Sequence, residues 1–329
     1  MEKVRWGVIS TARIGTTRVI PAMQAGRFCD VVAIASRDLE SAQAAATQLG
    51  IPKAYGSYEE LLADAGIDAI YNPLPNHLHV SWSIKALEAG KHVLCEKPLA
   101  MSAAEAGMLL DAANQRPELK VTEAFMYRHH PQWDRVRQLL DEGAVGTLRA
   151  THSFFTYYNV DPDNIRNIAA VGGGALMDIG CYCISGTRYV FGSEPQRVLG
   201  IVEHDPEFKT DRLSSAVLDF GDGRATLTCA TQLSSYQRVT ILGTEGRLEV
   251  ETPFTPAPDH ACRIWHQRGQ TTDELVIAPV DHYMLQGDNF SRAVLDDTPL
   301  PTPLLDAVNN MKVIEAVFRS AERGAWVGV

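Results

Sequence analysis

Short apolar runs alternate with helical patterns over the first 125 residues of the chain. The apolar runs cover residues 6–9, 31–35, 69–71, 92–95 and 121–125. Serine followed three residues later by glutamate forms capping boxes that begin helices at Ser57 and Ser102, and Gly90 ends a helix that begins near Asn76. This alternation is typical of β-α-β units, in which helices join parallel strands. We therefore predict a parallel-sheet domain over residues 1–125.

Longer strand patterns replace this alternation after Gly146. They cover residues 147–157, 197–203, 214–220, 225–233, 238–242 and 247–251. Helical patterns accompany them at residues 131–142, 174–191, 283–296 and 303–323. Glycine-containing turns at 221–223 and 243–246 are typical of hairpins, so we expect a mainly antiparallel sheet. The predicted fold class is α/β, with a C-terminal α/β domain over residues 126–329 that holds a large open sheet.

The charge and composition of the chain indicate small-molecule partners. Its 30 basic and 40 acidic residues leave a net charge of −10, which disfavours binding to nucleic acid or to a membrane surface. No apolar run nears the roughly 18 residues of a membrane span, the first residues lack a secretory signal, and the six cysteines are too sparse for a disulfide scaffold. We expect a cytoplasmic protein that forms a homodimer or homotetramer through the uncovered face of its C-terminal sheet.

The turn after the first strand has the pattern of a dinucleotide-binding loop. A Rossmann fold places Gly-x-Gly-x-x-Gly here, because the backbone must turn tightly and approach the pyrophosphate at a helix N-terminus. In this chain Ser10, Ala12 and Gly15 occupy the three glycine positions. The candidate cofactor contacts in this loop are Ser10, Thr11, Ala12, Arg13 and Ile14. The alternative is that these small residues serve only the tight turn.

The end of the second strand indicates which nicotinamide cofactor is bound. NAD-preferring folds usually carry an acidic residue here, which binds the ribose 2′-hydroxyl. This chain has Ser36 and Arg37, a hydroxyl and a guanidinium that suit a 2′-phosphate, with Arg13 as a second cation. We therefore predict NADP. Two alternatives stay open: Arg37 is a solvated charge while Asp38 caps the next helix, or Asp38 binds the ribose and the cofactor is NAD.

Lys97 is the first candidate catalytic residue. It follows a strand at the carboxyl edge of the predicted parallel sheet, where doubly wound folds bind their ligands. Pro98 favours an extended backbone at Lys97. A lysine in this place can hold a substrate oxygen through a charged hydrogen bond and lower the pKa of a neighbouring acid. The alternative is an ordinary surface charge.

A glycine run at 172–174 leads into a predicted helix that carries Asp178 and Tyr182. These two residues are four apart and therefore share one helical face. Tyrosine has an ordinary pKa of about 10. A nearby Lys97 ammonium would favour the phenolate, which brings Tyr182 into the range of acid-base catalysis at neutral pH. The structural alternative is that Asp178 caps a helix and Tyr182 packs in a core.

Together these motifs resemble the family of glucose-fructose oxidoreductase, inositol dehydrogenase and rhizopine-catabolism proteins (Gfo/Idh/MocA), over essentially the whole chain. Glu96-Lys97-Pro98 is the most specific sign, and residues 71–79 are similar to the segment after the family's fourth strand. Residues 123–128 and 172–189 resemble the branch of glucose-fructose oxidoreductase, NADP-linked xylose dehydrogenase and dimeric dihydrodiol dehydrogenase. The resemblance implies cofactor contacts at Pro73, Leu74, Asn76, His79, Glu96 and Lys97.

The resemblance also implies hydride transfer between a nicotinamide and a sugar or cyclic polyol. Lys97 falls on the family's catalytic lysine and Asp178 on its site aspartate, while Tyr182 stands where many members have histidine. We therefore predict an NADP-dependent oxidoreductase in which Tyr182 is the acid or base, Lys97 stabilises charge on the substrate oxygen, and Asp178 positions the substrate. Glu96 is expected to orient Lys97 or to contact the nicotinamide ribose. Asn72 departs from the family's usual aliphatic or small residue and is expected to alter nicotinamide contacts.

Four further residues are candidate substrate contacts. They are Tyr127, Arg128, Tyr158 and Arg166, the last of which follows an irregular loop at 159–164. A hypothesis of another class is a non-catalytic NAD(P)-binding sensor or regulator on the same fold, although the presence of both Lys97 and Tyr182 argues against it. A metal enzyme is disfavoured, because the adjacent His129 and His130 point apart and Cys181-x-Cys183 would need further ligands.

Overall fold

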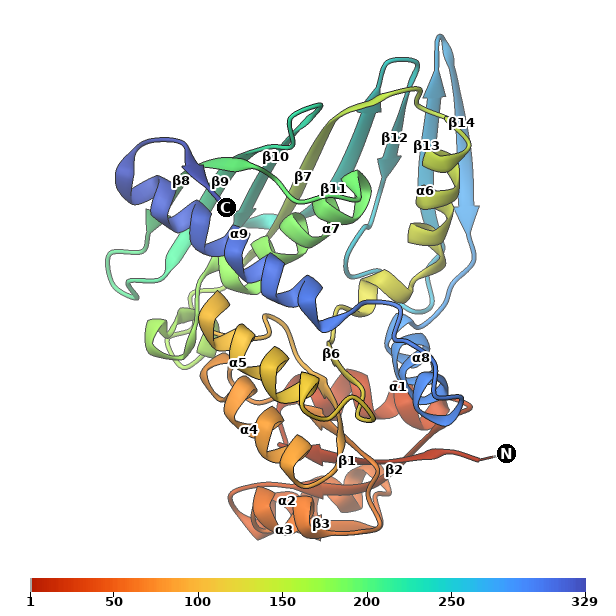
Figure 1. Cartoon of the computed structure of the whole chain (residues 1–329), viewed down its shortest axis with the longest axis vertical. Coiled ribbons are helices and arrows are strands. Elements are labelled where there is room, and N and C mark those ends of the chain that lie inside the picture. Colours follow the sequence, from red (N-terminus) through yellow and green to blue (C-terminus); the bar gives the residue numbers. More distant parts are fainter. Residues whose placement is uncertain (1) are drawn as a thin grey trace. The chain divides into compact units, whose positions relative to one another are not determined.

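The computed structural model describes residues 2–329, which divide into two compact units. The first unit contains the residues up to His129 together with Asp281–Val308, and the second contains His130–Val280 and Asn309–Val329. The sequence predicts one boundary, near residue 125, and assigns the predicted helix at 283–296 to the second domain. In the structure this helix belongs to the first unit. Figure 1 shows it, in blue, beside the red helix α1 from the beginning of the chain.

Six parallel strands form the sheet of the first unit. They are β1 (Val4–Ile9), β2 (Cys29–Ala35), β3 (Lys53–Tyr55), β4 (Ala69–Asn72), β5 (His92–Cys95) and β6 (Val121–Glu123). Their order is β3-β2-β1-β4-β5-β6, and every neighbouring pair is parallel. This order confirms the predicted Rossmann fold. Such sheets bind ligands where the strand order reverses, which here is at the carboxyl ends of β1 and β4.

Helices connect these strands, and one more helix, α8, joins them from a later part of the chain. They are α1 (Ile20–Ala25), α2 (Leu39–Leu49), α3 (Tyr58–Ala63), α4 (Asn76–Glu88), α5 (Ala103–Asn114) and α8 (His282–Leu295). The hydroxyls of Ser57 and Ser102 accept the amide N–H groups of Glu60 and Glu105 at 3.2 and 3.1 Å, as the capping boxes predict. Gly90, just after α4, has a φ of +72°, a conformation that glycine adopts without steric cost.

Helix α8 joins the first unit through a buried contact with β1. The indole N–H of Trp6 donates to the hydroxyl of Ser291 at 3.0 Å, and the Trp6 ring lies 5.1 Å from that of Phe290. The carboxylate of Asp288 accepts the amide N–H groups of Arg27 and Phe28. Trp6 and Phe290 are almost completely buried. This packing explains why a segment so late in the sequence folds with the first unit.

Nine strands form the sheet of the second unit. They are β7 (Leu148–Tyr158), β8 (Arg197–His204), β9 (Asp211–Asp219), β10 (Arg224–Ala230), β11 (Gln232–Gly243), β12 (Gly246–Val250), β13 (Cys262–Arg268), β14 (Thr271–Ile277) and β15 (Val327–Gly328). Their order is β14-β13-β12-β11-β7-β10-β9-β8-β15, and all neighbours are antiparallel except β7 and β10. The prediction of a large, mainly antiparallel sheet is confirmed. The β13-β14 hairpin was not predicted, because the mostly polar, exposed side chains of β14 give little hydrophobic alternation.

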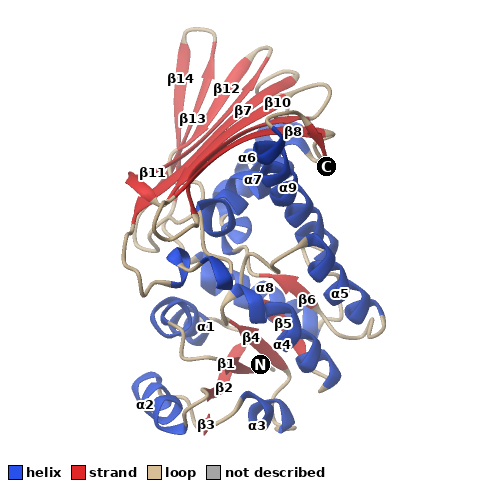
Figure 2. Cartoon of the chain, turned by 90° about the vertical axis from the view of Figure 1, so that its left-hand side faces the viewer, coloured by secondary structure: helices blue, strands red, loops and turns tan. Residues whose placement is uncertain are grey.

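Helices cover one face of this sheet, as Figure 2 shows. They are α6 (Pro131–Asp141), α7 (Cys181–Phe191) and α9 (Leu304–Arg323). Along β7, Ser153 and Phe155 are buried beneath these helices, while His152 and Tyr158 are exposed on the other face. The stretch Ala169–Phe191 has the length and hydropathy of a membrane-spanning helix, but 72% of its apolar window is buried inside the protein. Packing within this unit therefore accounts for its apolar composition.

Candidate active site

The loop after β1 forms a tight turn at the reversal of strand order. The hydroxyl of Ser10 accepts the amide N–H of Ala12 at 2.9 Å. The helix that follows begins as a π-helical turn at Gly15–Val19 before α1 continues, whereas the sequence predicts a regular helix. Arg13 is exposed, and the other four predicted cofactor contacts of this loop are half-buried. The loop thus places small residues and one cation where a Rossmann sheet binds a pyrophosphate.

Asp38, after β2, is the N-cap of α2. Its carboxylate accepts two amide N–H groups of the first turn, at 2.9 and 3.3 Å, and the hydroxyl of Ser41 at 2.6 Å. The hydrogen bond from the Ser41 side chain is the main reason why the pKa of Asp38 is lowered. The neighbouring Arg37 is exposed. Burial raises the pKa of Tyr58, and the charge of Arg37 lowers it in part. The donors left beside the cap are the Ser36 hydroxyl and the Arg37 guanidinium, which suit a phosphate.

Asn72 organises the loop between β4 and α4. Its Nδ2 donates to the carbonyl oxygen of His79 at 3.0 Å and to the hydroxyl of Ser83 at 3.1 Å. Its Oδ1 accepts the amide N–H of Leu74 at 3.2 Å. The Asn72 side chain is fully buried, so it shapes the loop that carries Pro73 and Leu74 through contacts within the protein.

His79 connects this loop to the turn that carries Lys97. Its Nε2 lies 2.6 Å from the carbonyl oxygen of Leu74, and its Nδ1 lies 2.8 Å from the carbonyl oxygen of Pro98. The ring is 1% exposed, and burial lowers its pKa to about 4. The neutral ring therefore donates to one of the two carbonyl groups. Because both nitrogens face the backbone, His79 supports the turn.

Glu96 is held at the carboxyl end of β5. The hydroxyl of Tyr71 donates to Oε1 of Glu96 at 2.7 Å, and the amide N–H of Lys97 donates to Oε2 at 3.3 Å. Burial raises the pKa of Tyr71, and the Glu96 charge raises it further, so this phenol is a neutral donor. The Lys97-Pro98 peptide bond is cis, and Lys97 is half-buried. Lys97 thus leaves the sheet directly beside a fixed carboxylate, as expected if Glu96 orients it.

In the second unit, the carboxylate of Asp178 accepts hydrogen bonds from two side chains that lie on different elements. The hydroxyl of Tyr157, near the end of β7, donates to Oδ2 of Asp178 at 2.7 Å. Nε of Arg166, on the loop after β7, donates to the same oxygen at 2.8 Å. The Asp178 charge raises the pKa of Arg166, and burial followed by the Asp178 charge raises that of Tyr157. We name Tyr157, Arg166 and Asp178 the carboxylate cluster; it contains a neutral phenol, a cation and an anion.

Close backbone packing anchors the loop that carries Arg166. The carbonyl oxygen of Arg166 accepts the amide N–H of Gly174 at 2.8 Å. A Cβ atom on Gly173 would lie 2.5 Å from the same carbonyl oxygen, and one on Gly174, whose φ is +121°, would lie 2.0 Å from the carboxylate of Asp211. The glycine run therefore lets the loop return tightly to the helix that bears Asp178.

Tyr182 lies at the start of α7 and is 4% exposed. Its ring centroid is 5.6 Å from those of Phe155 and Phe254. The preceding residues, Leu176–Gly180, form a π-helical turn, so the spacing from Asp178 to Tyr182 is not that of the regular helix predicted from the sequence. Tyr182 is the last of the groups that raise the pKa of Arg166, after Asp178 and Tyr157. Single π-helical turns are frequent at functional sites.

The other three predicted substrate contacts have different surroundings. Tyr158 is 67% exposed on the uncovered face of the sheet, opposite to its neighbour Tyr157. Tyr127 is fully buried, and its hydroxyl accepts Nε of Arg128 at 3.2 Å. Arg128 also donates to Asp306 at 3.2 Å. The sequence prediction thus missed Tyr157, although the inward alternation through Ser153 and Phe155 would have placed it on the covered face.

The cysteines and histidines considered for a metal site have other surroundings. All six cysteines are buried and free, and burial raises the pKa of Cys183. His129 lies 3.1 Å from the side chain of Asn289, and His130 caps α6. Within residues 2–329, no group of three His, Cys, Asp or Glu side chains has a geometry that could hold a metal ion.

Two family models match the chain. Residues 4–125 match the oxidoreductase family with an NAD-binding Rossmann fold, and residues 133–249 match the Gfo/Idh/MocA C-terminal domain. The chain belongs to the Gfo/Idh/MocA oxidoreductase family. The match of both halves confirms the resemblance predicted from the Glu96-Lys97-Pro98 and 172–189 segments, and it makes this chain a nicotinamide-dependent oxidoreductase.

Several Gfo/Idh/MocA relatives match the chain over almost its whole length. An uncharacterized oxidoreductase of Rhizobium meliloti is 48% identical, with 99% of each chain covered. A D-xylose 1-dehydrogenase (NADP(+)) of Haloferax volcanii is 37% identical, with 98% of each covered. A 3-ketoreductase of Actinomadura kijaniata, solved with NADP and TDP-benzene, is 32% identical, with a TM-score of 0.91 over 97% of this chain and 98% of that one.

Proposed function

We propose that this Gfo/Idh/MocA protein is an NADP-dependent oxidoreductase that interconverts a hydroxyl and a carbonyl group on a sugar or cyclic polyol. The observation that carries the proposal is the carboxylate cluster, in which Asp178 accepts hydrogen bonds from Tyr157 and Arg166. Polar clusters with perturbed pKa values of this kind are typical of functional sites. Relatives whose names specify xylose and NADP support the substrate class and the cofactor.

In the oxidising direction each of these residues has its own role. Tyr182 takes the proton from the substrate hydroxyl, and the Lys97 ammonium stabilises the negative charge that develops on that oxygen. Asp178 accepts a hydrogen bond from the substrate and thereby orients it. When bound, NADP would supply the hydride acceptor. In the reducing direction the same residues return the proton to the carbonyl oxygen. Solved structures of the Actinomadura kijaniata relative include variants in which one lysine or one tyrosine is replaced. These variants support the choice of Lys97 and Tyr182 as the reacting pair.

The residues at the carboxyl edge of the Rossmann sheet fit NADP. Backbone amides of the loop Ser10 to Ile14 would meet the pyrophosphate, and Arg37 with Ser36 would bind the 2′-phosphate. Because Asp38 caps α2, Ser36 and Arg37 would determine the preference between NADP and NAD. The loop that carries Pro73, Leu74 and Asn76 would line the nicotinamide end of the cofactor site with its backbone. Asn72 and His79 shape this loop. Glu96 orients Lys97.

Turnover measured at 340 nm with a panel of aldoses, cyclic polyols and diols tests this function. We expect NADP-dependent turnover of at least one class, and a loss of about a hundredfold or more in Lys97→Met and in Tyr182→Phe. Full turnover in both variants would contradict the mechanism. NADPH binding, seen as a change in nicotinamide fluorescence, without turnover of any compound would favour the alternative of a non-catalytic sensor.

The uncovered face of the sheet fits a second copy of the chain. Ile201 is 73% exposed and Tyr236 is 49% exposed on this face, and Tyr158 lies on it as well. The Arg238 guanidinium lies 5.2 Å from the Trp265 ring. Exposed apolar groups of this extent on a sheet face suit a homodimer or homotetramer. Light scattering after gel filtration should give a multiple of 36.1 kDa, and Ile201→Lys should reduce it.

A further inference from the structure

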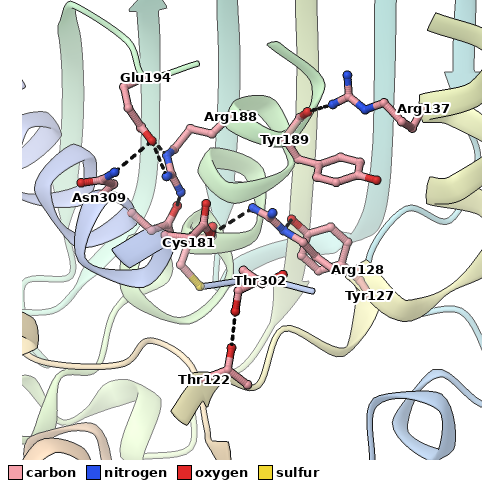
Figure 3. A network of polar contacts seen from close by, with 12 residues as sticks. Thr122, Tyr127, Arg128, Arg137, Cys181, Arg188, Tyr189, Glu194, Thr302 and Asn309 are labelled. Carbon is pink, nitrogen blue, oxygen red and sulfur yellow. Dashed lines mark hydrogen bonds and ion pairs between the residues drawn. The ribbon is translucent and has the colours of Figure 1, made fainter. Parts of the chain in front are cut away.

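A buried arginine anchors the end of α7 in the second unit. Arg188 is 4% exposed, and its Nε and Nη2 each donate to a carboxylate oxygen of Glu194 at 2.6 Å. Figure 3 shows this bidentate pair together with Asn309, whose Nδ2 donates to Glu194 at 3.2 Å. Bidentate contacts of this kind fix the plane of the guanidinium.

Arg188 also contacts Asn310 of helix α9, and Asn310 in turn contacts α7. Its Nη1 donates to Oδ1 of Asn310 at 3.3 Å. Nδ2 of Asn310 then donates to the carbonyl oxygen of Cys181 at 3.2 Å. Asn310 is 1% exposed. The hydrogen-bond chain from Glu194 therefore ends on a backbone carbonyl between Asp178 and Tyr182.

This carbonyl lies where the helix changes its geometry. Leu176–Gly180 is a π-helical turn, and the regular helix α7 begins at Cys181. A π-helical turn is a rare arrangement that neighbouring structure must hold in place. Asp178 belongs to this turn and Tyr182 follows it, so the direction of both side chains depends on the turn. The Asn310 amide is a side-chain donor from another helix at this junction.

Stability alone is a weak explanation for this arrangement. A buried ion pair contributes little net stability, because desolvation of its charges offsets their attraction. The Glu194 side chain is 44% exposed, which weakens the pair further. Conformational specificity is the best-attested use of such buried polar groups.

We propose that Asn310, held by Arg188, is a positioning residue that fixes the turn bearing Asp178 and Tyr182. The role in turnover rests on the proposed oxidoreductase function. Asn310 acts on this turn through the backbone carbonyl of Cys181. Its loss should therefore lower kcat and leave the affinity for NADPH unchanged.

The chain offers a matched pair of substitutions. Asn310→Asp keeps the shape of the side chain and its acceptor for Arg188, but it removes the donor to the Cys181 carbonyl. Asn114→Asp makes the same change of charge on an exposed side chain at the end of α5, outside this hydrogen-bond network. Where Asn310→Asp fails to fold, Asn310→Ala removes the donor without adding a charge.

Two measurements on the full chain test the proposal. Hydrogen exchange of a peptide covering residues 176–184 should be faster in Asn310→Asp and unchanged in Asn114→Asp. With a substrate identified by the 340 nm panel, kcat should fall about tenfold in Asn310→Asp, the loss expected for one hydrogen bond of this type, with the NADPH dissociation constant within about twofold of wild type. Asn114→Asp should keep the wild-type kcat.

The outcomes separate this proposal from the proposed function. Unchanged exchange at 176–184 in Asn310→Asp would overturn the positioning role, whatever the activity. Faster exchange with an unchanged kcat would overturn its link to catalysis. Wild-type protein that turns over no compound would remove the proposed function, while exchange alone would still decide whether Asn310 holds the turn.

Discussion

Tyr157 donates a hydrogen bond of 2.7 Å to Asp178, whereas its neighbour Tyr158 lies on the opposite face of the same strand and is 67% exposed. Tyr157→Phe removes only the hydroxyl. Because hydrogen bonds to charged groups are the stronger ones, we expect kcat/KM to fall about tenfold through a less well oriented Asp178. Initial rates at 340 nm, with NADP saturating, measure this.

Tyr158→Phe is the control for that prediction. It makes the same chemical change on the uncovered face, so kcat/KM should stay within about twofold of wild type. Equal losses in the two variants would show that the tyrosine hydroxyls act through the sheet as a whole and not through Asp178.

Cofactor preference is expected to depend on Arg37. Arg37→Ala should raise the KM for NADP by about tenfold or more, since it removes a charged hydrogen bond to the 2′-phosphate, and should leave the KM for NAD unchanged. Arg18→Ala, which removes an exposed arginine from the π-helical turn after the loop, is the control. An equal change for NAD and NADP in Arg37→Ala would assign Arg37 to another part of the cofactor.

Helix α8 is expected to be part of the folding unit of the Rossmann sheet. Phe290→Ala removes a ring that is 2% exposed and packs on Trp6, so it should lower the free energy of unfolding by about 3–5 kcal/mol. Met108→Ala, at a side chain 60% exposed on α5, should change it by less than about 0.5 kcal/mol. Urea denaturation measures both. A small effect of Phe290→Ala would mean that α8 adds little to this unit.

His130 is expected to make the protein sensitive to acid. Its Nδ1 accepts the amide N–H of Gln132 at 3.2 Å, and burial lowers its pKa to about 4, below the ordinary 6.5. Between these values the folded state binds fewer protons than the unfolded state. The stability from this cap is therefore fully present above about pH 6.5 and is lost as the pH falls through about 4.

His130→Asn keeps an acceptor at the cap and removes the titration. The melting temperature should depend less steeply on pH between 6.5 and 4. The reason is that unfolding would take up about one proton fewer in this range. Equal slopes in wild type and His130→Asn would show that another group carries the acid sensitivity.

Much of the fold follows from local signals in the sequence. The capping serines Ser57 and Ser102, the alternating apolar runs and the glycine turns depend on residues close to one another along the chain, and the structure confirms them. The place of α8 does not follow from such signals. Its apolar face is compatible with either unit, and only the contacts of Trp6 and Asp288 decide.

For the candidate site, the sequence by itself determined the chemical types and their order: a lysine after a strand, then an aspartate and a tyrosine after a glycine run. Motifs carry this information because a turn or helix start is encoded within a few residues. Only the tertiary structure decided that Tyr157 and Arg166 share one oxygen of Asp178, that Asn310 reaches the Cys181 carbonyl, and that Leu176–Gly180 forms a π-helical turn. Hydrogen bonds between elements depend on how whole strands and helices pack, and no local pattern encodes that packing.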